Sequence, residues 1–189
     1  MGIINGNDFI NRLNTLKNEI WFDGQKVEGP ISEHPAFKGI VKSKAALYDV
    51  QHNPSIKDDM TFTSPLSGEL VGTSYLQPKT KEDLMKRSRM IEHWARHTGG
   101  FMGRSPDYLN TVLMSLASSA RFLEGKENCF PDNIRALYEL ARENDLSFTH
   151  TFISPQVNRS QVYMENTPEP IAAKIIEEND KGLVIKGAR

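Results

Sequence analysis

The sequence has one cysteine, no long apolar run and no excess of either charge, and each absence excludes a class of protein. Cys129 alone cannot form an internal disulfide, and one thiol cannot build a zinc knuckle or a cysteine-ligated iron–sulfur cluster. No apolar run approaches the roughly 18 residues that a membrane helix needs. Polar residues interrupt the first twenty positions, which excludes a signal peptide. We therefore expect a soluble, cytoplasmic protein in a reducing compartment.

Charge identifies no macromolecular partner. The 23 basic and 24 acidic residues are spread along the chain and give a net charge of -1, so no overall field attracts nucleic acid or anionic lipid. The 189 residues, 38% of them apolar, are enough for one globular domain, or for one domain and part of a second.

Helical periodicity dominates the chain to about residue 144. Asn7 or Asp8 is predicted to cap a first helix, and Asp23-Gly24 has the composition of a tight hairpin turn. Further helices are predicted to begin at four proline- or threonine-marked sites: His34-Pro35, Thr80 with Asp83 as a capping box, Ser105-Pro106 and Pro131. Gly99-Gly100 is expected to end the third of these five helices.

The spacing of apolar residues predicts which face of each helix is buried. For the helix after His34 the predicted stripe is Phe37, Ile40, Val41, Leu47 and Tyr48. For the helix after Thr80 it is Leu84, Ser88, Ile91 and Ala95. The last two helices are predicted to bury Leu109, Val112, Leu113, Leu116 and Ala120, and then Ile134, Leu137 and Ala141.

Beyond residue 145 the pattern changes from helical to alternating. Residues 146–153 are predicted to form a strand, and the runs 171–178 and 182–186 a hairpin turned at 179–181, while 60–62 and 69–71 are shorter extended runs. The predicted fold class is α+β: a mostly helical domain over residues 1–144 leads into the first strands of a β domain over residues 145–189. Two or three strands are too few for a stable sheet, so this β domain is expected to be incomplete.

Three residues have the chemistry of a site. Arg104 and Tyr108 flank the predicted helix start at Ser105, where a positive helix end favours an oxyanion, and His150 can exchange a proton near neutral pH. Each also has an ordinary interpretation. Arg104 could pair with a surface carboxylate, Tyr108 could be a half-buried aromatic, and His150 could be a hydrogen-bonded core histidine.

Two weaker patterns are set aside. His93 and His97 lie one helical turn apart but lack the His-Glu-x-x-His pattern, so no metal site is predicted. The glycine-rich run 99–103 follows no strand and has no Gly-Lys-Ser/Thr ending, which excludes a phosphate-binding loop.

Two longer runs carry a resemblance. Residues 100–108 (GFMGRSPDY) and 150–156 (HTFISPQ) resemble the 4-hydroxyphenylacetate 3-monooxygenase family, with further matches at 34–37, 47–49 and 180–188. The family is similar in fold to acyl-CoA dehydrogenases, with a helical domain, a central β domain and a C-terminal bundle. Its members use reduced FAD from a separate flavin reductase, form a flavin hydroperoxide with oxygen and hydroxylate a phenol ortho to its oxygen.

For this sequence, the resemblance implies that Arg104, Tyr108 and His150 surround the phenol oxygen and the reactive edge of the flavin. It also implies that residues 151–156 line the flavin, with Thr151, Ser154 and Gln156 as cofactor-binding candidates. Expected partners are a phenolic substrate, the reductase, further copies of the chain, and a C-terminal part or second polypeptide that completes the fold.

Two alternatives stay open at this point. The chain could be a truncated helical module that keeps the motif residues without catalysis. A similar branch, 4-hydroxybutyryl-CoA dehydratase, holds an iron–sulfur cluster largely through cysteines, and the absence of cysteine around Arg104 disfavours it.

Overall fold

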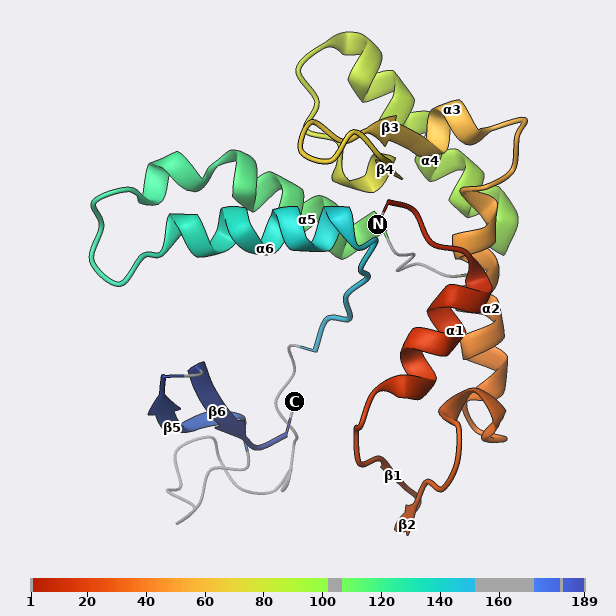
Figure 1. Cartoon of the computed structure of the whole chain (residues 1–189), viewed down its shortest axis with the longest axis vertical. Helices are drawn as coiled ribbons and strands as arrows, with labels where there is room; N and C mark the ends of the chain where they lie inside the picture. Colours follow the sequence, from red (N-terminus) through yellow and green to blue (C-terminus); the bar gives the residue numbers. More distant parts are fainter. Residues whose placement is uncertain (1, 102–106, 152–171, 181, 189) are drawn as a thin grey trace, which may run out of the picture. The chain divides into compact units, whose positions relative to one another are not determined.

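The computed structural model describes residues 2–101, 107–151, 172–180 and 182–188. The chain divides into two compact units, Met1–Phe148 and Thr149–Arg189. The first unit holds all the helices of the described residues (Figure 1). The domain boundary that the sequence suggests near residue 144 stays a prediction.

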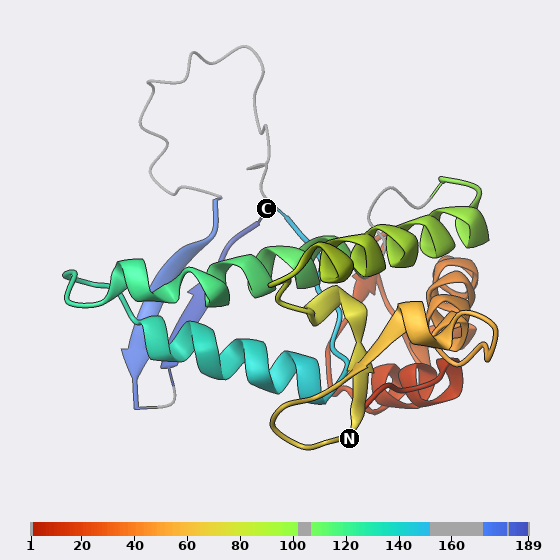
Figure 2. The same ribbon diagram turned by 90° about the horizontal axis from the view of Figure 1, so that it is seen from above.

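The described residues of the first unit form six α-helices and three short 3-10 helices. The α-helices are α1 (Gly6–Thr15), α2 (Lys38–Val50), α3 (Lys57–Met60), α4 (Lys81–Thr98), α5 (Asp107–Ser118) and α6 (Pro131–Glu143). The 3-10 helices are η1 (Ile31–Glu33), η2 (Thr73–Tyr75) and η3 (Ala120–Leu123). Figures 1 and 2 both draw α5 and α6 side by side, and α1 packs against α2.

The described strands form three antiparallel pairs. They are β1 (Trp21–Phe22) with β2 (Gln25–Lys26), β3 (Thr61–Thr63) with β4 (Leu70–Gly72), and β5 (Lys174–Asn179) with β6 (Gly182–Lys186). The predicted turn at Asp23-Gly24 is confirmed, because both residues have positive φ (50° and 73°). Helices followed by a β hairpin confirm the α+β fold class.

Local capping signals set two helix starts. The predicted capping box of Thr80 and Asp83 is present at the start of α4, and Gly99, with φ 60°, ends that helix as predicted. The predicted cap of α1 was wrong. Asn5 is the cap, and Asp8 is its reciprocal partner three residues later.

The second helix begins later than the sequence predicts. His34 has extended backbone (φ -64°, ψ 130°) because the following proline disfavours the helical conformation at that position. The amides of Phe37 and Lys38 both donate to the His34 carbonyl, and α2 starts at Lys38. Ile40 was wrongly placed on the buried face, whereas Val41, Leu47 and Tyr48 are buried.

The predicted buried face of α4 is wrong. Leu84 and Ile91 are exposed, and the buried residues of this helix are Arg87, Met90 and Trp94. Met90 and Trp94 pack with Leu47 and Met60 to form one cluster, which we call the α2–α4 core. The helix carries two apolar stripes, and the one with the bulkier side chains is buried.

A second cluster, the α5–α6 core, lies between η2 and the last two helices. Its buried members are Tyr75, Leu113, Met114, Ala117, Tyr138 and Ala141. Ile134 is partly buried against it, and Ala120 is fully buried, so these predictions are confirmed. Val112, Leu116 and Leu137 are exposed, contrary to prediction.

The predicted strand at residues 146–153 is not observed over its described part. Residues 146–151 are in no strand, since no other segment of the described chain pairs with them; Phe152 and Ile153 lie outside the described residues. The alternation itself is present. Leu146 and Phe148 pack against the α5–α6 core, while Ser147 meets the hydroxyl of Tyr48.

Candidate functional site

The structure describes three of the six residues predicted to form the site. Tyr108 lies in the first turn of α5 with 45% of its surface exposed, and His150 and Thr151 are exposed at the start of the second unit. Arg104, Ser154 and Gln156 lie outside the described residues. Tyr108 and His150 belong to different units, so their meeting in one site stays a prediction.

The first turns of α5 are held by buried polar contacts from inside the first unit. Asn110, only 2% exposed, donates through Nδ2 to Ser74 Oγ of η2 (3.1 Å). Thr111 Oγ1 accepts a hydrogen bond from Arg87 Nη2 at 2.7 Å. Tyr108 therefore stands on a helix that both η2 and α4 fix in place.

Arg87 is the central cation of this framework. Its Nη1 atom donates to the carbonyls of Thr73, Ser74 and Leu76, at 2.9, 3.0 and 3.1 Å. Carbonyls at the end of a helical turn lack partners within the helix, and a guanidinium can serve several of them at once. Arg87 thus joins α4, η2 and α5 through these hydrogen bonds.

The chain leaves the first unit through residues 145–148, which we call the exit segment. Asp145 adopts positive φ (47°), which aspartate tolerates better than most residues. The hydroxyl of Tyr75 donates to the Leu146 carbonyl at 2.6 Å, and that of Tyr48 donates to Ser147 Oγ at 2.8 Å. Two side-chain hydroxyls therefore hold the segment that leads to His150.

Both tyrosine hydroxyls are hydrogen-bond donors at neutral pH. Burial raises the pKa of Tyr48 to about 12, against a smaller lowering by its hydrogen bond with Ser147. Burial also raises the pKa of Tyr75, and the nearby Asp145 carboxylate adds to that increase. The two hydroxyls stay neutral, as donation to the exit segment requires.

Asp145 is a buried carboxyl at the root of the exit segment, with 4% of its surface exposed. Its Oδ2 atom accepts from the Ile4 amide at 3.1 Å and from Gln51 Nε2 at 2.9 Å. Burial raises its pKa from 3.8 to about 6, although both hydrogen bonds act in the opposite direction. This carboxyl joins the N-terminal segment and α2 to the end of α6.

Sequence reasoning missed Arg87, Asp145, Tyr48 and Tyr75 as parts of this framework. A signal for Arg87 was present, because it shares a helix face with Met90 and Trp94 at spacings of three and seven residues. A charged residue on an apolar stripe indicates a buried contact with polar groups.

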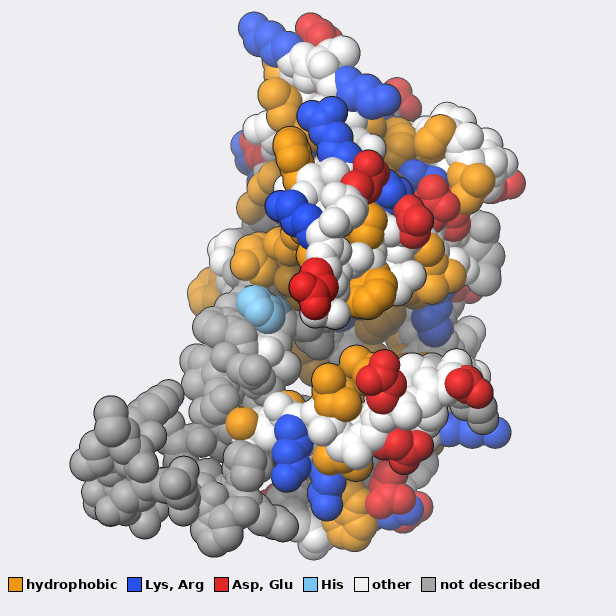
Figure 3. All heavy atoms as spheres, turned by 90° about the vertical axis from the view of Figure 1, so that its left-hand side faces the viewer, with side chains coloured by type: hydrophobic (Ala, Val, Ile, Leu, Met, Phe, Trp, Pro, Cys, Tyr) orange, Lys and Arg blue, Asp and Glu red, His pale blue; other side chains and the backbone are white. Residues whose placement is uncertain are grey.

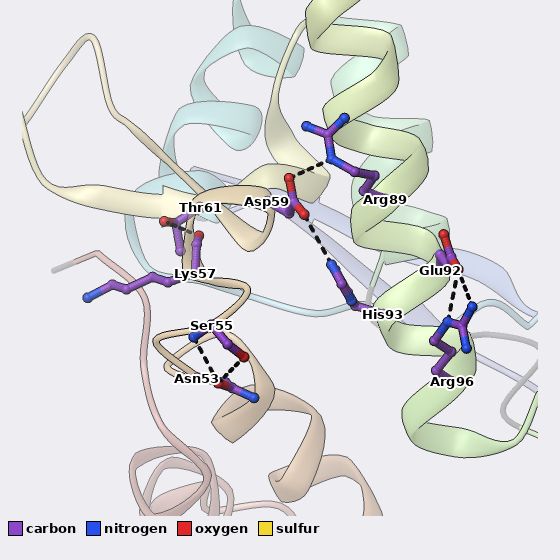
Figure 4. Close-up of polar contacts among 9 residues, drawn as sticks. All are labelled: Asn53, Ser55, Lys57, Asp59, Thr61, Arg89, Glu92, His93 and Arg96. Atoms are coloured by element: carbon purple, nitrogen blue, oxygen red, sulfur yellow. Dashed lines mark hydrogen bonds and ion pairs between the residues drawn. The ribbon is translucent and has the colours of Figure 1, made fainter.

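His93 and Arg89 both contact one carboxylate, that of Asp59. His93 Nε2 lies 3.1 Å from Asp59 Oδ2, and Arg89 Nε donates to Asp59 Oδ1 at 2.7 Å, so one carboxylate of α3 holds two side chains of α4 (Figure 4). The described residues contain no group of three side chains suited to a metal ion. Among those same residues, the helices are too short or too polar to cross a membrane.

Comparison with known proteins shows the family to which the chain belongs. The family model described as "4-hydroxyphenylacetate 3-hydroxylase N terminal" matches residues 5–189. The chain belongs to this family. It is 62% identical over 189 residues to a probable 4-hydroxyphenylacetate 3-monooxygenase of Bacillus subtilis (strain 168), with 100% of this chain and 39% of that protein covered.

Solved structures agree with the family assignment. A crystal structure of the oxygenase component of 4-hydroxyphenylacetate 3-monooxygenase, complexed with FAD and 4-hydroxyphenylacetate, is 41% identical and superposes with a TM-score of 0.84. The match covers 98% of this chain and 38% of that one. An archaeal 4-hydroxybutyryl-CoA dehydratase from N. maritimus shares the fold alone, at 19% identity, a TM-score of 0.72 and coverage of 98% of this chain and 36% of that one. The chain thus spans less than two fifths of the length of these relatives.

Proposed function

We propose that this chain is the N-terminal part of a reduced-FAD-dependent monooxygenase that hydroxylates a phenol ortho to its hydroxyl group, giving a catechol. The substrate is of the 4-hydroxyphenylacetate type, and a separate flavin reductase supplies the reduced FAD. The observation that carries this proposal is the family match over residues 5–189. The chain would act as part of an oxygenase component, as the names of its relatives describe them. We further propose that this component assembles from several copies of the chain.

The described candidate residues fit such a cofactor and substrate. Tyr108, His150 and Thr151 offer a phenol, an imidazole and an aliphatic hydroxyl, and all three are at least partly exposed. A flavin ring presents carbonyl oxygens and ring nitrogens that accept hydrogen bonds, and a phenolate presents an anionic oxygen. The donor set therefore suits both ligands.

Each candidate has a role that follows from its chemistry. Arg104 and Tyr108 donate hydrogen bonds to the phenol oxygen as negative charge develops on it, and His150 takes up and returns the phenol proton. Thr151, Ser154 and Gln156 orient the flavin ring. Bound reduced FAD supplies the chemistry that activates oxygen, while these protein groups orient and polarise the substrate.

The 189-residue chain by itself is expected to bind FAD weakly or not at all and to form no catechol. A flavin site must bury most of its ligand, and this chain spans 39% of its Bacillus relative. Apolar side chains such as Ile175, Ile185, Leu137 and Leu140 are exposed, and the face in Figure 3 shows apolar groups between charged ones. Such surfaces favour association with further protein.

Titration with oxidised and reduced FAD, followed by a catechol assay with a reductase supplied, tests both statements. The comparison is the same chain joined or mixed with a C-terminal part that completes it to the length of its relatives. Catechol from the completed protein alone is the expected result. No catechol from the completed protein would overturn the proposed function, and tight binding with turnover by the 189 residues would overturn the need for further chain.

A further inference from the structure

We propose that Tyr75 and Tyr48 are positioning residues that fix the exit segment and thereby set where His150 is presented to the substrate. This inference rests on the proposed function of His150. It concerns two hydroxyl groups deep in the helical unit, 75 and 102 positions before His150 in the sequence.

The exit segment is held at successive residues by bonds of different kinds. The Leu146 amide donates to the Ala141 carbonyl at 3.0 Å, closing the end of α6, and the Leu146 carbonyl accepts from Tyr75. Ser147 then bonds to Tyr48 through its side chain. Only Phe148 and Thr149 stand between Ser147 and His150 in the sequence, so the last residue held by these hydroxyls is three positions before His150.

Tyr75 is itself rigidly held. It is fully buried, its ring meets that of Tyr138 edge to face at 6.2 Å between centroids, and its carbonyl accepts from the Tyr138 hydroxyl at 2.7 Å. The neighbouring carbonyls of η2 accept from Arg87. A hydroxyl that is held in this way can fix the conformation of the exit segment, which lies in no helix or strand.

The same framework contacts α5, the helix that carries Tyr108. Arg87 bonds to Thr111, three residues after Tyr108, so one buried guanidinium supports both the η2 turn that carries Tyr75 and the helix that carries Tyr108. The start of α5 and the exit segment therefore have a common support within the first unit. A shift of η2 would alter both.

The hydrogen bonds from Tyr75 and Tyr48 take the place of the strand pairing that would hold this segment in a sheet. The exit segment has no strand partner within the described chain, and backbone groups outside a sheet need other hydrogen-bond partners. Phenylalanine at position 75 would fill the same space in the α5–α6 core, and phenylalanine at position 48 would keep the stacking on Phe9. Each change would remove the bond to the exit segment. An apolar ring could provide the same packing at these positions. The tyrosine hydroxyl adds a directional hydrogen bond to the exit segment.

Hydrogen exchange on this chain tests the positioning directly. Tyr75→Phe and Tyr48→Phe are expected to speed exchange of the amides from Asp145 to Phe148 by about three- to tenfold each, the effect of losing one neutral hydrogen bond, with exchange in α4 unchanged. Thr61→Val is the matched control, since it also removes one buried hydroxyl bond to a carbonyl, that of Lys57 at 2.9 Å. Unchanged exchange of the exit segment in both tyrosine variants would overturn the proposal.

A second measurement separates positioning from stability. In the oxygenase completed to the length of its relatives, Tyr75→Phe is expected to lower catechol formed per reduced FAD consumed by about threefold or more, while flavin binding is kept. Thr61→Val is expected to leave that ratio unchanged. Faster exchange with an unchanged ratio would overturn the positioning role. If the unsubstituted completed protein forms no catechol, the proposed function fails, and the exchange measurement alone then decides whether these tyrosines fix the segment.

Discussion

Replacement of His150 by alanine in the completed oxygenase is expected to lower the rate of phenol hydroxylation by roughly two to four orders of magnitude. The imidazole is the candidate that takes the phenol proton, and a lost general base has effects of this size. His150 is exposed, so the substitution should leave the fold intact. The measurement is the rate of catechol formation, together with the catechol formed per reduced FAD consumed.

His93→Ala is the matched control for this prediction. His93 is a partly buried histidine that contacts Asp59 on α3, and it stands outside both runs that carry the family resemblance. Its removal should leave hydroxylation unchanged. An unchanged product yield after His150→Ala would contradict the catalytic role and leave an ordinary structural histidine.

The second large effect is expected from Asp145, whose raised pKa makes the stability of the fold depend on pH. The folded chain holds a proton on this carboxyl up to about pH 6, whereas the unfolded chain loses it near 3.8. The stabilising contribution of the protonated form is therefore complete below about pH 4 and is lost as the pH rises through 6. A shift of this size corresponds to about 3 kcal/mol.

Asp145→Asn isolates this effect, because asparagine has the shape of the protonated acid, tolerates positive φ and does not titrate. The difference in the free energy of unfolding between the variant and the unmodified chain should change by about 3 kcal/mol between pH 4 and pH 7, in favour of the variant at pH 7. Urea unfolding across this range measures it. A difference that stays constant with pH would show that Asp145 does not titrate as its burial implies.

Two signals that lie within a few residues of one another predicted the structure correctly. The turn at Asp23-Gly24 and the capping box of Thr80 and Asp83 depend only on neighbouring residues, and both are observed. The buried face of α4 could not be predicted in this way. The helix offers two apolar stripes, and the choice depends on Leu47 and Met60, which reach it from other elements.

The framework around the candidate site could not be predicted from sequence patterns either, because its contacts join residues that are distant in the sequence. Arg87 is buried because carbonyls of η2, more than ten residues earlier in the chain, accept from it. Asp145 is buried against the amide of Ile4, 141 positions away. Arg104, Tyr108 and His150 were singled out by their chemistry and their predicted places on a helix start and a strand, but spacing and composition did not distinguish them from ordinary side chains. The resemblance to a family gave them a common site and added Thr151, Ser154 and Gln156.

The claim that Arg104, Tyr108 and His150 share one site is tested most directly by a crystal structure of the completed oxygenase with FAD and a phenol bound. We predict that the three side chains converge on the phenol oxygen and the reactive edge of the flavin, with donor-to-acceptor distances of about 3 Å. His150 pointing away from the start of α5, with no cavity shared with Tyr108, would contradict it.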